Sequence, residues 1–304
     1  MRVLVTGANG FIGRHVLVPL IARGGNVHAV GRTVIDTADV TSHVADLMDQ
    51  AAVAAVVQAV RPTHLLHLAW CTTPGLYWTA RENLDWVAAS LHLCRCFIDS
   101  GGKRMVVAGS CAEYDWSVPL LDERTTPCIP TTLYGMTKNA LHHLLREAAR
   151  LEGISLAWGR VHFLYGPGEK PGRLVSTVAT ALWDGDVVST TAGTQIRDFM
   201  HVVDGAGAFA ALCDSTVTGP INIATGIARP VREIIERLGM LSGRADLLRI
   251  GGRPSPAGEP PRLDVSVARL TEEVGFRPRF DLASGLADTM EWWRQKSFMR
   301  IESP

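Results

Sequence analysis

The chain has 304 residues, and its 30 Lys and Arg balance its 30 Asp and Glu, so the formal net charge is zero. A protein of this length can bury a substantial core, as one large α/β domain or as two smaller ones. Without a surplus of basic residues the chain lacks the charge that binds a phosphate backbone, which disfavours nucleic acid as a partner.

Cysteine and histidine spacing indicates neither disulfides nor a metal site. The 6 cysteines contain no Cys-x-x-Cys pair, and we expect reduced, mostly buried thiols. No pair among the 10 histidines has zinc-ligand spacing with a further ligand, so no metal is expected. Strand-like residues begin at position 2, and no apolar run reaches the roughly 20 residues that cross a bilayer. We therefore expect a soluble, cytoplasmic protein without a membrane partner.

The opening residues, 1–16, combine a short apolar strand with a glycine-rich turn. Residues 3–5 predict a buried parallel strand, and three glycines follow at three-residue intervals before an amphipathic helix pattern. Such glycines permit a tight turn, a close approach of backbone to a pyrophosphate, and close packing of helix on strand. A ligand-free glycine turn is the alternative. The residues expected to contact the pyrophosphate at the helix N-terminus are Gly7, Gly10, Phe11, Ile12 and Gly13.

A second strand, residues 26–30, ends at Gly31-Arg32-Thr33. In a dinucleotide-binding fold an acidic residue at this junction binds the ribose 2′-hydroxyl of NAD, whereas an arginine accommodates the 2′-phosphate of NADP. Arg32 can form a bidentate, charge-assisted contact with that phosphate. We predict NADP, with NAD as the alternative if Arg32 is only a solvated surface residue. Asp36 and Asp39 lie too far along the chain to replace it.

Strand and helix patterns then alternate. Strands are predicted at 43–47, 64–69, 103–110 and 154–159, with helices at 51–60, 83–98 and 134–151 between them. The alternation predicts an α/β fold with a doubly wound parallel sheet.

Ser110 ends the strand over 103–110, and Tyr134 and Lys138 follow four residues apart, on one face of the next helix. A phenol has an ordinary pKa of about 10, and a nearby ammonium favours the phenolate and lowers that pKa. The three residues together can exchange a proton with a carbonyl or alcohol. Cys111 is the nearest competitor to Ser110, and a chance Tyr/Lys pair is the alternative.

The segment Thr6–Gly13 and the order Ser, then Tyr-x-x-x-Lys, resemble the extended short-chain dehydrogenase/reductase family, the NAD-dependent epimerase/dehydratase group. The similarity continues in segments 160–167, 197–204 and 221–226 and covers nearly the whole chain. It implies a doubly wound Rossmann sheet with a smaller, discontinuous substrate-binding lobe. The implied boundaries are a dinucleotide-binding domain over 1–165, with a return segment near 196–225, and a lobe mainly over 166–304.

The resemblance also implies residue roles. Ser110 would bind the substrate oxygen, Tyr134 would transfer the proton, and Lys138 would hold the nicotinamide ribose. Asp46 and Leu47 would lie against the adenine. The other implied contacts are Leu68 and Ala69 beneath the cofactor, Phe163 at a position where the family commonly has a substrate-binding asparagine, and Arg197 at a substrate diphosphate. Arg262 is a weaker diphosphate candidate, for which a surface ion pair is the favoured interpretation.

One departure from the family separates its activities. Family dehydratases follow the hydroxyl residue with Asp-Glu, and this chain has Cys111-Ala112 there, with Glu113 expected on the other face of the extended segment. The pattern favours an NADPH-dependent reductase of a nucleotide-linked 4-keto-6-deoxy sugar. The alternatives are an NAD-dependent nucleotide-sugar 4-epimerase and a non-catalytic NADP-binding regulatory protein. A homodimer through the long helices is expected from the resemblance.

Overall fold

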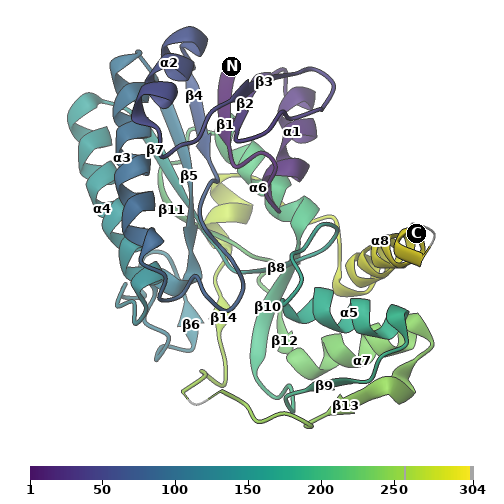
Figure 1. Cartoon of the computed structure of the whole chain (residues 1–304). Helices are drawn as coiled ribbons and strands as arrows, with labels where there is room; N and C mark the ends of the chain where they lie inside the picture. The colour runs from purple at the N-terminus through teal and green to yellow at the C-terminus, as the bar shows by residue number, and fades with distance from the viewer. Residues whose placement is uncertain (257, 302–304) are drawn as a thin grey trace.

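The computed structural model describes residues 1–256 and 258–301 and shows one large parallel sheet with helices on both faces (Figure 1). Seven strands pair in the order β11-β7-β5-β4-β1-β2-β3, all parallel. Their bounds are β1 Arg2–Thr6, β2 Asn26–Gly31, β3 Val40–Val44, β4 His64–His67, β5 Arg104–Ser110, β7 Ser155–Val161 and β11 Gly219–Ile223. The predicted doubly wound α/β fold is confirmed.

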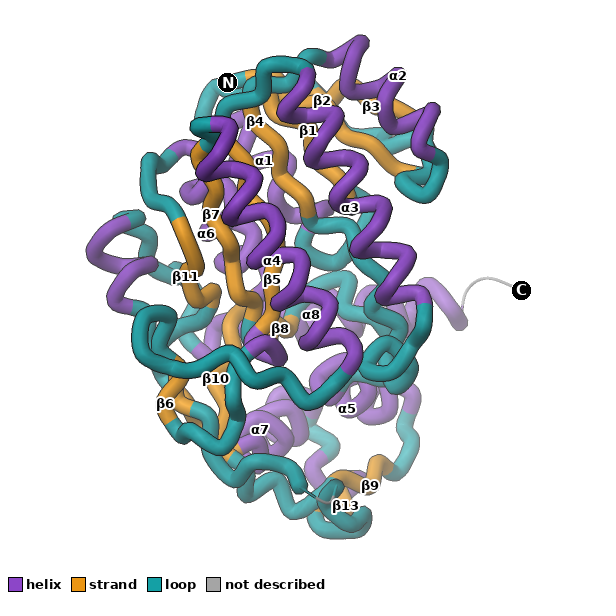
Figure 2. Tube along the Cα trace, turned by 90° about the vertical axis from the view of Figure 1, so that its left-hand side faces the viewer, coloured by secondary structure: helices purple, strands orange, loops and turns teal. Residues whose placement is uncertain are grey.

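Two helical layers cover the sheet because its strands are apolar on both faces. Val3 and Val5 of β1 belong to the core under α1 (Gly13–Ala22) and α6 (Val202–Asp214). Leu4, between them, points to the opposite core. There the covering helices are α2 (Gln50–Val60), α3 (Glu82–Asp99) and α4 (Leu133–Glu152), which lie side by side on the face that Figure 2 turns toward the viewer.

The second half of the chain forms a smaller region below the sheet in Figure 1. A three-stranded sheet has the order β12-β10-β8, and the pairs β13-β9 and β14-β6 are two-stranded. A separate apolar core joins helices α5, α7 and α8. The bounds are β6 Leu120–Leu121, β8 Phe163–Tyr165, β9 Val188–Thr190, β10 Ile196–His201, β12 Ala228–Pro230, β13 Leu248–Ile250, β14 Asp264–Val265, α5 Leu174–Asp184, α7 Val231–Ser242 and α8 Leu282–Ile301.

The chain crosses between the two regions more than once. After β10 it returns to the large sheet as α6, which packs on α1, and as β11, which pairs with β7 at the sheet edge. The sheet therefore includes residues from far beyond position 165, within the segment for which the sequence predicts a return.

Two predicted strands have different bounds in the structure. The strand expected over 43–47 is β3, Val40–Val44, so Asp46 lies in the following turn, where its carboxylate accepts from the Met48 amide at 3.0 Å. The strand expected over 64–69 ends at His67. Leu68 and Ala69 instead form the backbone segment that contacts Gly7, because a Cβ on Gly7 would lie 2.8 Å from the Ala69 nitrogen.

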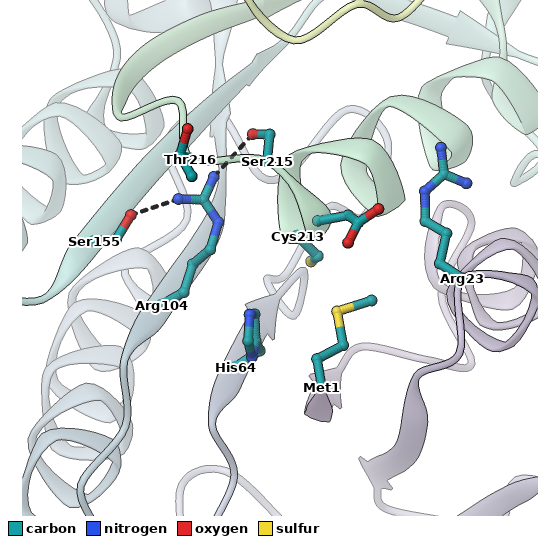
Figure 3. A pocket seen from close by; sticks show the side chains of 9 residues that line it. Met1, Arg23, His64, Arg104, Ser155, Cys213, Ser215 and Thr216 are labelled. Carbon is teal, nitrogen blue, oxygen red and sulfur yellow. Dashed lines mark hydrogen bonds between the residues drawn. The ribbon is translucent and has the colours of Figure 1, made fainter.

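At the amino ends of the strands, Arg104 joins three parts of the fold (Figure 3). Its buried guanidinium donates to the carbonyls of Leu212 and Val217 and to the hydroxyls of Ser155 and Ser215. These contacts give a buried donor to the Leu212 carbonyl, in the last turn of α6, and to the Val217 carbonyl beyond that helix. An open surface cavity of about 580 Å³ lies beside them. Since this side chain is already saturated by oxygen acceptors, we assign it a structural role.

Among the described residues, no helix is long and apolar enough to cross a membrane. All six cysteines are free thiols.

Candidate functional site

The carboxyl ends of β1, β4 and β5 meet at one edge of the sheet and bring the predicted residues together. Gly7 follows β1 with φ 71°, in the left-handed region that favours glycine. A Cβ on Gly13 would lie 2.0 Å from the Gly7 carbonyl oxygen, so the start of α1 packs directly on the turn. No side chain caps α1 at Ile12. The Arg14 and His15 amides donate to the Gly10 and Ile12 carbonyls, so the amides of the turn before them are the ones that can bind an anion.

Arg32 stands next to this turn. The Asn9 amide nitrogen donates to the Thr33 hydroxyl at 3.0 Å, which ties the end of β2 to the glycine turn. The Arg32 side chain is exposed. The fold thus brings the segment that carries Arg32 beside the glycine turn.

One further backbone segment, which follows β4, borders the turn. The Ala69 amide donates to the Thr6 hydroxyl at 3.2 Å, and the Leu68 amide donates to the Thr6 carbonyl at 3.3 Å. Leu47 is buried and Asp46 is exposed after β3. The structure thereby brings Leu68 and Ala69 against the turn and leaves the Asp46 carboxylate at the surface.

Ser110 is held at the end of β5 by a short 3₁₀ turn, Cys111–Glu113. Its hydroxyl accepts from the Ala112 amide at 3.2 Å, and its own amide donates to the Glu113 carboxylate at 2.7 Å, a reciprocal capping box. The start of α4 lies directly against this turn, because a Cβ on Gly135 would come within 2.3 Å of the Ala112 oxygen. The close approach brings Tyr134 to Ser110.

Tyr134 and Lys138 are both buried, with 8% and 3% of their surfaces exposed. Burial raises the pKa of the Tyr134 phenol, and a hydrogen bond with Ser110 opposes that rise. Burial also lowers the pKa of Lys138 to about 7, against a smaller opposing effect of the Glu113 charge. The sequence predicts a phenol pKa lowered by the ammonium. In the structure burial is the largest effect on both groups, and the pKa of the phenol is raised instead.

Aromatic rings surround the Tyr134 phenol, a packing arrangement that the sequence does not predict. Tyr77 and Trp78 meet the Tyr134 ring edge to face, with centroids at 4.9 and 5.8 Å. The Lys138 ammonium lies 3.7 Å from the Trp70 ring centroid and donates to the Ala108 carbonyl at 2.9 Å. Such a cation–π contact stabilises a buried ammonium.

Glu113 is a second feature that the sequence does not predict. Expected on the far face of an extended segment, its carboxylate instead turns into the protein and is fully buried, ion-paired with Arg160 at 2.9 Å. The Trp158 indole also donates to it at 2.9 Å. A capping-box pattern of Ser followed three residues later by Glu is the signal that could have found it.

The predicted substrate-binding arginines are engaged within the chain. Arg197 is 4% exposed and donates to the Pro260 carbonyl at 2.7 Å and to Glu259 at 3.1 Å. Phe163 packs on Phe199, with ring centroids at 5.6 Å, and the Arg197 guanidinium carbon is 5.8 Å from the Phe163 ring. Arg262 forms an exposed ion pair with Asp264, as the favoured interpretation states.

Within residues 1–256 and 258–301, no group of three or more His, Cys, Asp or Glu side chains has the arrangement of a metal site.

Residues 3–224 match the family described as the NAD dependent epimerase/dehydratase family. The chain belongs to this family. It is thus an enzyme of the extended short-chain dehydrogenase/reductase type, with an NAD(P)-dependent oxidoreductase chemistry.

Full-length relatives of this family enzyme have more than one activity. A UDP-glucose 4-epimerase from Halalkalibacterium halodurans is 24% identical over 97% of this chain and 96% of its own. A dTDP-4-dehydro-6-deoxy-D-allose reductase from a Streptomyces species is 27% identical, with 96% of each chain covered. Among solved structures, the Thermus thermophilus UDP-glucose 4-epimerase in complex with NAD is 26% identical with a TM-score of 0.83, over 97% of this chain and 99% of its own.

Proposed function

We propose that this protein is an NADPH-dependent reductase of a nucleotide-linked 4-keto-6-deoxy sugar. The observation that carries the proposal is the buried group of Ser110, Tyr134 and Lys138 at the carboxyl edge of the sheet, beside the glycine turn. A reductase needs its tyrosine protonated at the start of the reaction. Burial, which raises the pKa of the Tyr134 phenol, favours that form.

Each side chain has a task in this reaction. The Ser110 hydroxyl donates to the substrate carbonyl oxygen, and the Tyr134 phenol gives its proton to that oxygen as the carbonyl becomes an alcohol. The Lys138 ammonium then stabilises the phenolate that remains. The dinucleotide, when bound, supplies the hydride that the carbonyl carbon accepts.

The glycine turn has the close packing of a dinucleotide-binding turn, because a Cβ on Gly7, Gly10 or Gly13 would collide with the backbone of the turn or of the segment after β4. Arg32, beside it, supports NADP over NAD. The residues that we propose to hold the cofactor are Gly7, Gly10, Phe11, Ile12, Gly13, Arg32, Asp46, Leu47, Leu68, Ala69, Tyr134 and Lys138. Ser110, Phe163 and Arg197 would contact the substrate, Arg197 after exchange of its Glu259 partner for a diphosphate.

We also propose the larger arrangement that the sequence predicts. Residues 1–165 with a return near 196–225 would bind the cofactor, and 166–304 would mainly bind the substrate. A homodimer through α3 and α4 is supported by exposed apolar side chains on these helices, among them Leu84 and Leu144.

The test is oxidation of NADPH by the purified protein with 4-keto-6-deoxyhexoses linked to dTDP, CDP, GDP or UDP. We expect turnover with at least one of them and little with NADH. A 4-epimerase, the second candidate because relatives have that activity, would instead retain tightly bound NAD and interconvert sugar epimers without consuming NADPH. Binding of NADPH with neither activity would favour the regulatory alternative.

A further inference from the structure

A buried carboxylate lies directly behind the proposed reacting residues. Glu113 has no exposed surface, and its Oε2 pairs with the Arg160 guanidinium, which is itself 3% exposed. Its Oε1 accepts from the Ser110 amide at 2.7 Å and from the Trp158 indole at 2.9 Å. A carboxylate buried this deeply is retained only where its charge and lone pairs are satisfied.

The backbone of β5 leaves space for this network. A Cβ on Gly109 would lie 2.1 Å from the Trp158 indole nitrogen and 2.6 Å from the Glu113 Oε1. Gly109 precedes Ser110, so the carboxylate and the indole pack against the very strand end that carries the hydroxyl. The orientation of Ser110 thus depends on Glu113 through a direct hydrogen bond.

We propose that Glu113 is a positioning residue: it fixes Ser110 through the Ser110 amide and places the carboxylate of its ion pair with Arg160 behind Tyr134 and Lys138. The inference rests on the proposed function for the roles of those three residues. It assigns to Glu113 and Arg160 a part in the reaction, although neither side chain contacts the substrate.

The groups around Tyr134 and Lys138 determine in which direction the Glu113 charge shifts their pKa values. Glu113 raises the pKa of Lys138 and that of Tyr134, in each case as a smaller effect than burial. The other groups facing Tyr134 are Tyr77, Cys111 and Ser110. Lys138 also faces His67, whose pKa is lowered to about 3, chiefly by burial, so this imidazole is neutral. Arg160 in turn faces Tyr114, Cys128 and His142.

Loss of the Glu113 charge should therefore lower the pKa of both Lys138 and Tyr134. The positive charge of the unpaired Arg160 would also lower both pKa values. In the reductase direction the phenol would lose its proton at lower pH. The basic limb of the pH profile of kcat/KM is expected to move toward acid by about one pH unit.

The experiment compares Glu113→Gln with the wild-type protein by two measurements. Lysine labelled with 13C gives the titration of Lys138 by NMR, assigned with Lys138→Met, and requires no substrate. We expect the Lys138 midpoint to fall by about one pH unit. The pH profile with NADPH and a substrate identified by the panel above should shift as described, with kcat reduced about tenfold.

Two more variants keep the outcome decisive if Glu113→Gln does not fold. The double variant Glu113→Gln with Arg160→Met removes both charges, which buried pairs often tolerate, and should still lower the Lys138 midpoint. Glu113→Asp keeps the charge, but its shorter side chain moves the carboxylate away from the Ser110 amide. We therefore expect kcat to fall without a shift of the basic limb of the pH profile. Glu123→Gln, a buried carboxylate that instead accepts from the Asn222 amide, is the matched control and should leave both measurements unchanged.

Unchanged Lys138 midpoints in folded Glu113→Gln and in the folded double variant, or an unchanged kcat in Glu113→Asp, would overturn the assignment of Glu113. Failure of the wild-type protein to reduce any 4-keto sugar would overturn the proposed function while the NMR titration still tests the effect of the buried charge.

Discussion

The hydroxyl of Tyr134 is the one group that the proposed reaction cannot replace. Tyr134→Phe keeps the ring among Tyr77 and Trp78, so packing and cofactor binding should persist. We expect kcat to fall at least about 100-fold, the range in which loss of a general acid acts. Stopped-flow or steady-state NADPH oxidation measures the loss, and fluorescence titration measures the binding. Turnover near the wild-type rate would contradict proton transfer by Tyr134.

Arg32 carries the prediction of cofactor preference. Arg32→Ala should weaken NADPH binding about 10- to 100-fold, because a charge-assisted contact to the 2′-phosphate is lost, and leave NADH binding unchanged. Isothermal titration with both dinucleotides gives the ratio. Arg277→Ala, at another exposed arginine, is the control and should change neither affinity.

Lys138 makes stability depend on pH in a defined direction. Its pKa is about 7 in the folded protein and near its ordinary 10.5 when unfolded, so between these values the unfolded state binds more protons. Stability should therefore rise with pH across that window through this group. Lys138→Met removes the contribution and should be more stable than the wild type by several kcal/mol at pH 6, on the order of the cost of a buried charge.

Urea unfolding of Lys138→Met and wild type between pH 6 and pH 10 checks this prediction. The difference in free energy of unfolding should shrink as the pH rises. A constant difference across that range would mean that Lys138 does not titrate there.

Among the elements, β5 begins with Arg104, to which we assign a role in fold stability, and ends with Ser110, to which we assign a role in the reaction. Arg104→Met would remove the guanidinium's hydrogen bonds to the Leu212 and Val217 carbonyls and to the Ser155 and Ser215 hydroxyls, at a cost of about 3 kcal/mol or more. A lower melting temperature with unchanged NADPH affinity at 25 °C is the expected result. An unchanged melting temperature would indicate that water replaces the guanidinium.

Element type was predictable where a pattern extends over a whole segment. The continuous apolar run of β1 predicted a buried parallel strand, and the Tyr-x-x-x-Lys spacing of α4 predicted the candidate pair. Strand ends were less predictable. β3 ends at Val44 because the Asp46 carboxylate accepts from the Met48 amide and forms a local turn. Strand propensity alone does not show that this turn is preferred to a longer strand. The Glu113–Arg160 pair joins positions 47 residues apart, and only the fold shows that they meet.

At the scale of the molecule, α3 and α4 lie on the face of the fold turned to the viewer in Figure 2. The apolar side chains of Leu84 on α3 and Leu144 on α4 are exposed. If a homodimer forms there, Leu144→Glu should produce a monomer in light scattering, because a charge would be buried in the interface. Met240→Glu, at an exposed position on α7, is the control and should keep the dimer. A monomeric wild type would refute the proposed assembly.

The candidate site gathers from segments scattered along the chain: the opening turn, the end of β2, the end of β4, the 3₁₀ turn and α4. The sequence could predict these because parallel strands end at one edge. It could not predict how Trp70 covers the Lys138 ammonium, since that contact depends on the path of a loop.

The absence of a side chain at Gly135 has a mechanical consequence. Helix and 3₁₀ turn touch backbone to backbone there, so no rotamer change can loosen the joint between them. The hydroxyl of residue 110 and the phenol of residue 134 should therefore move as parts of a single rigid body. Any opening that admits substrate must then come from the loops that border this body.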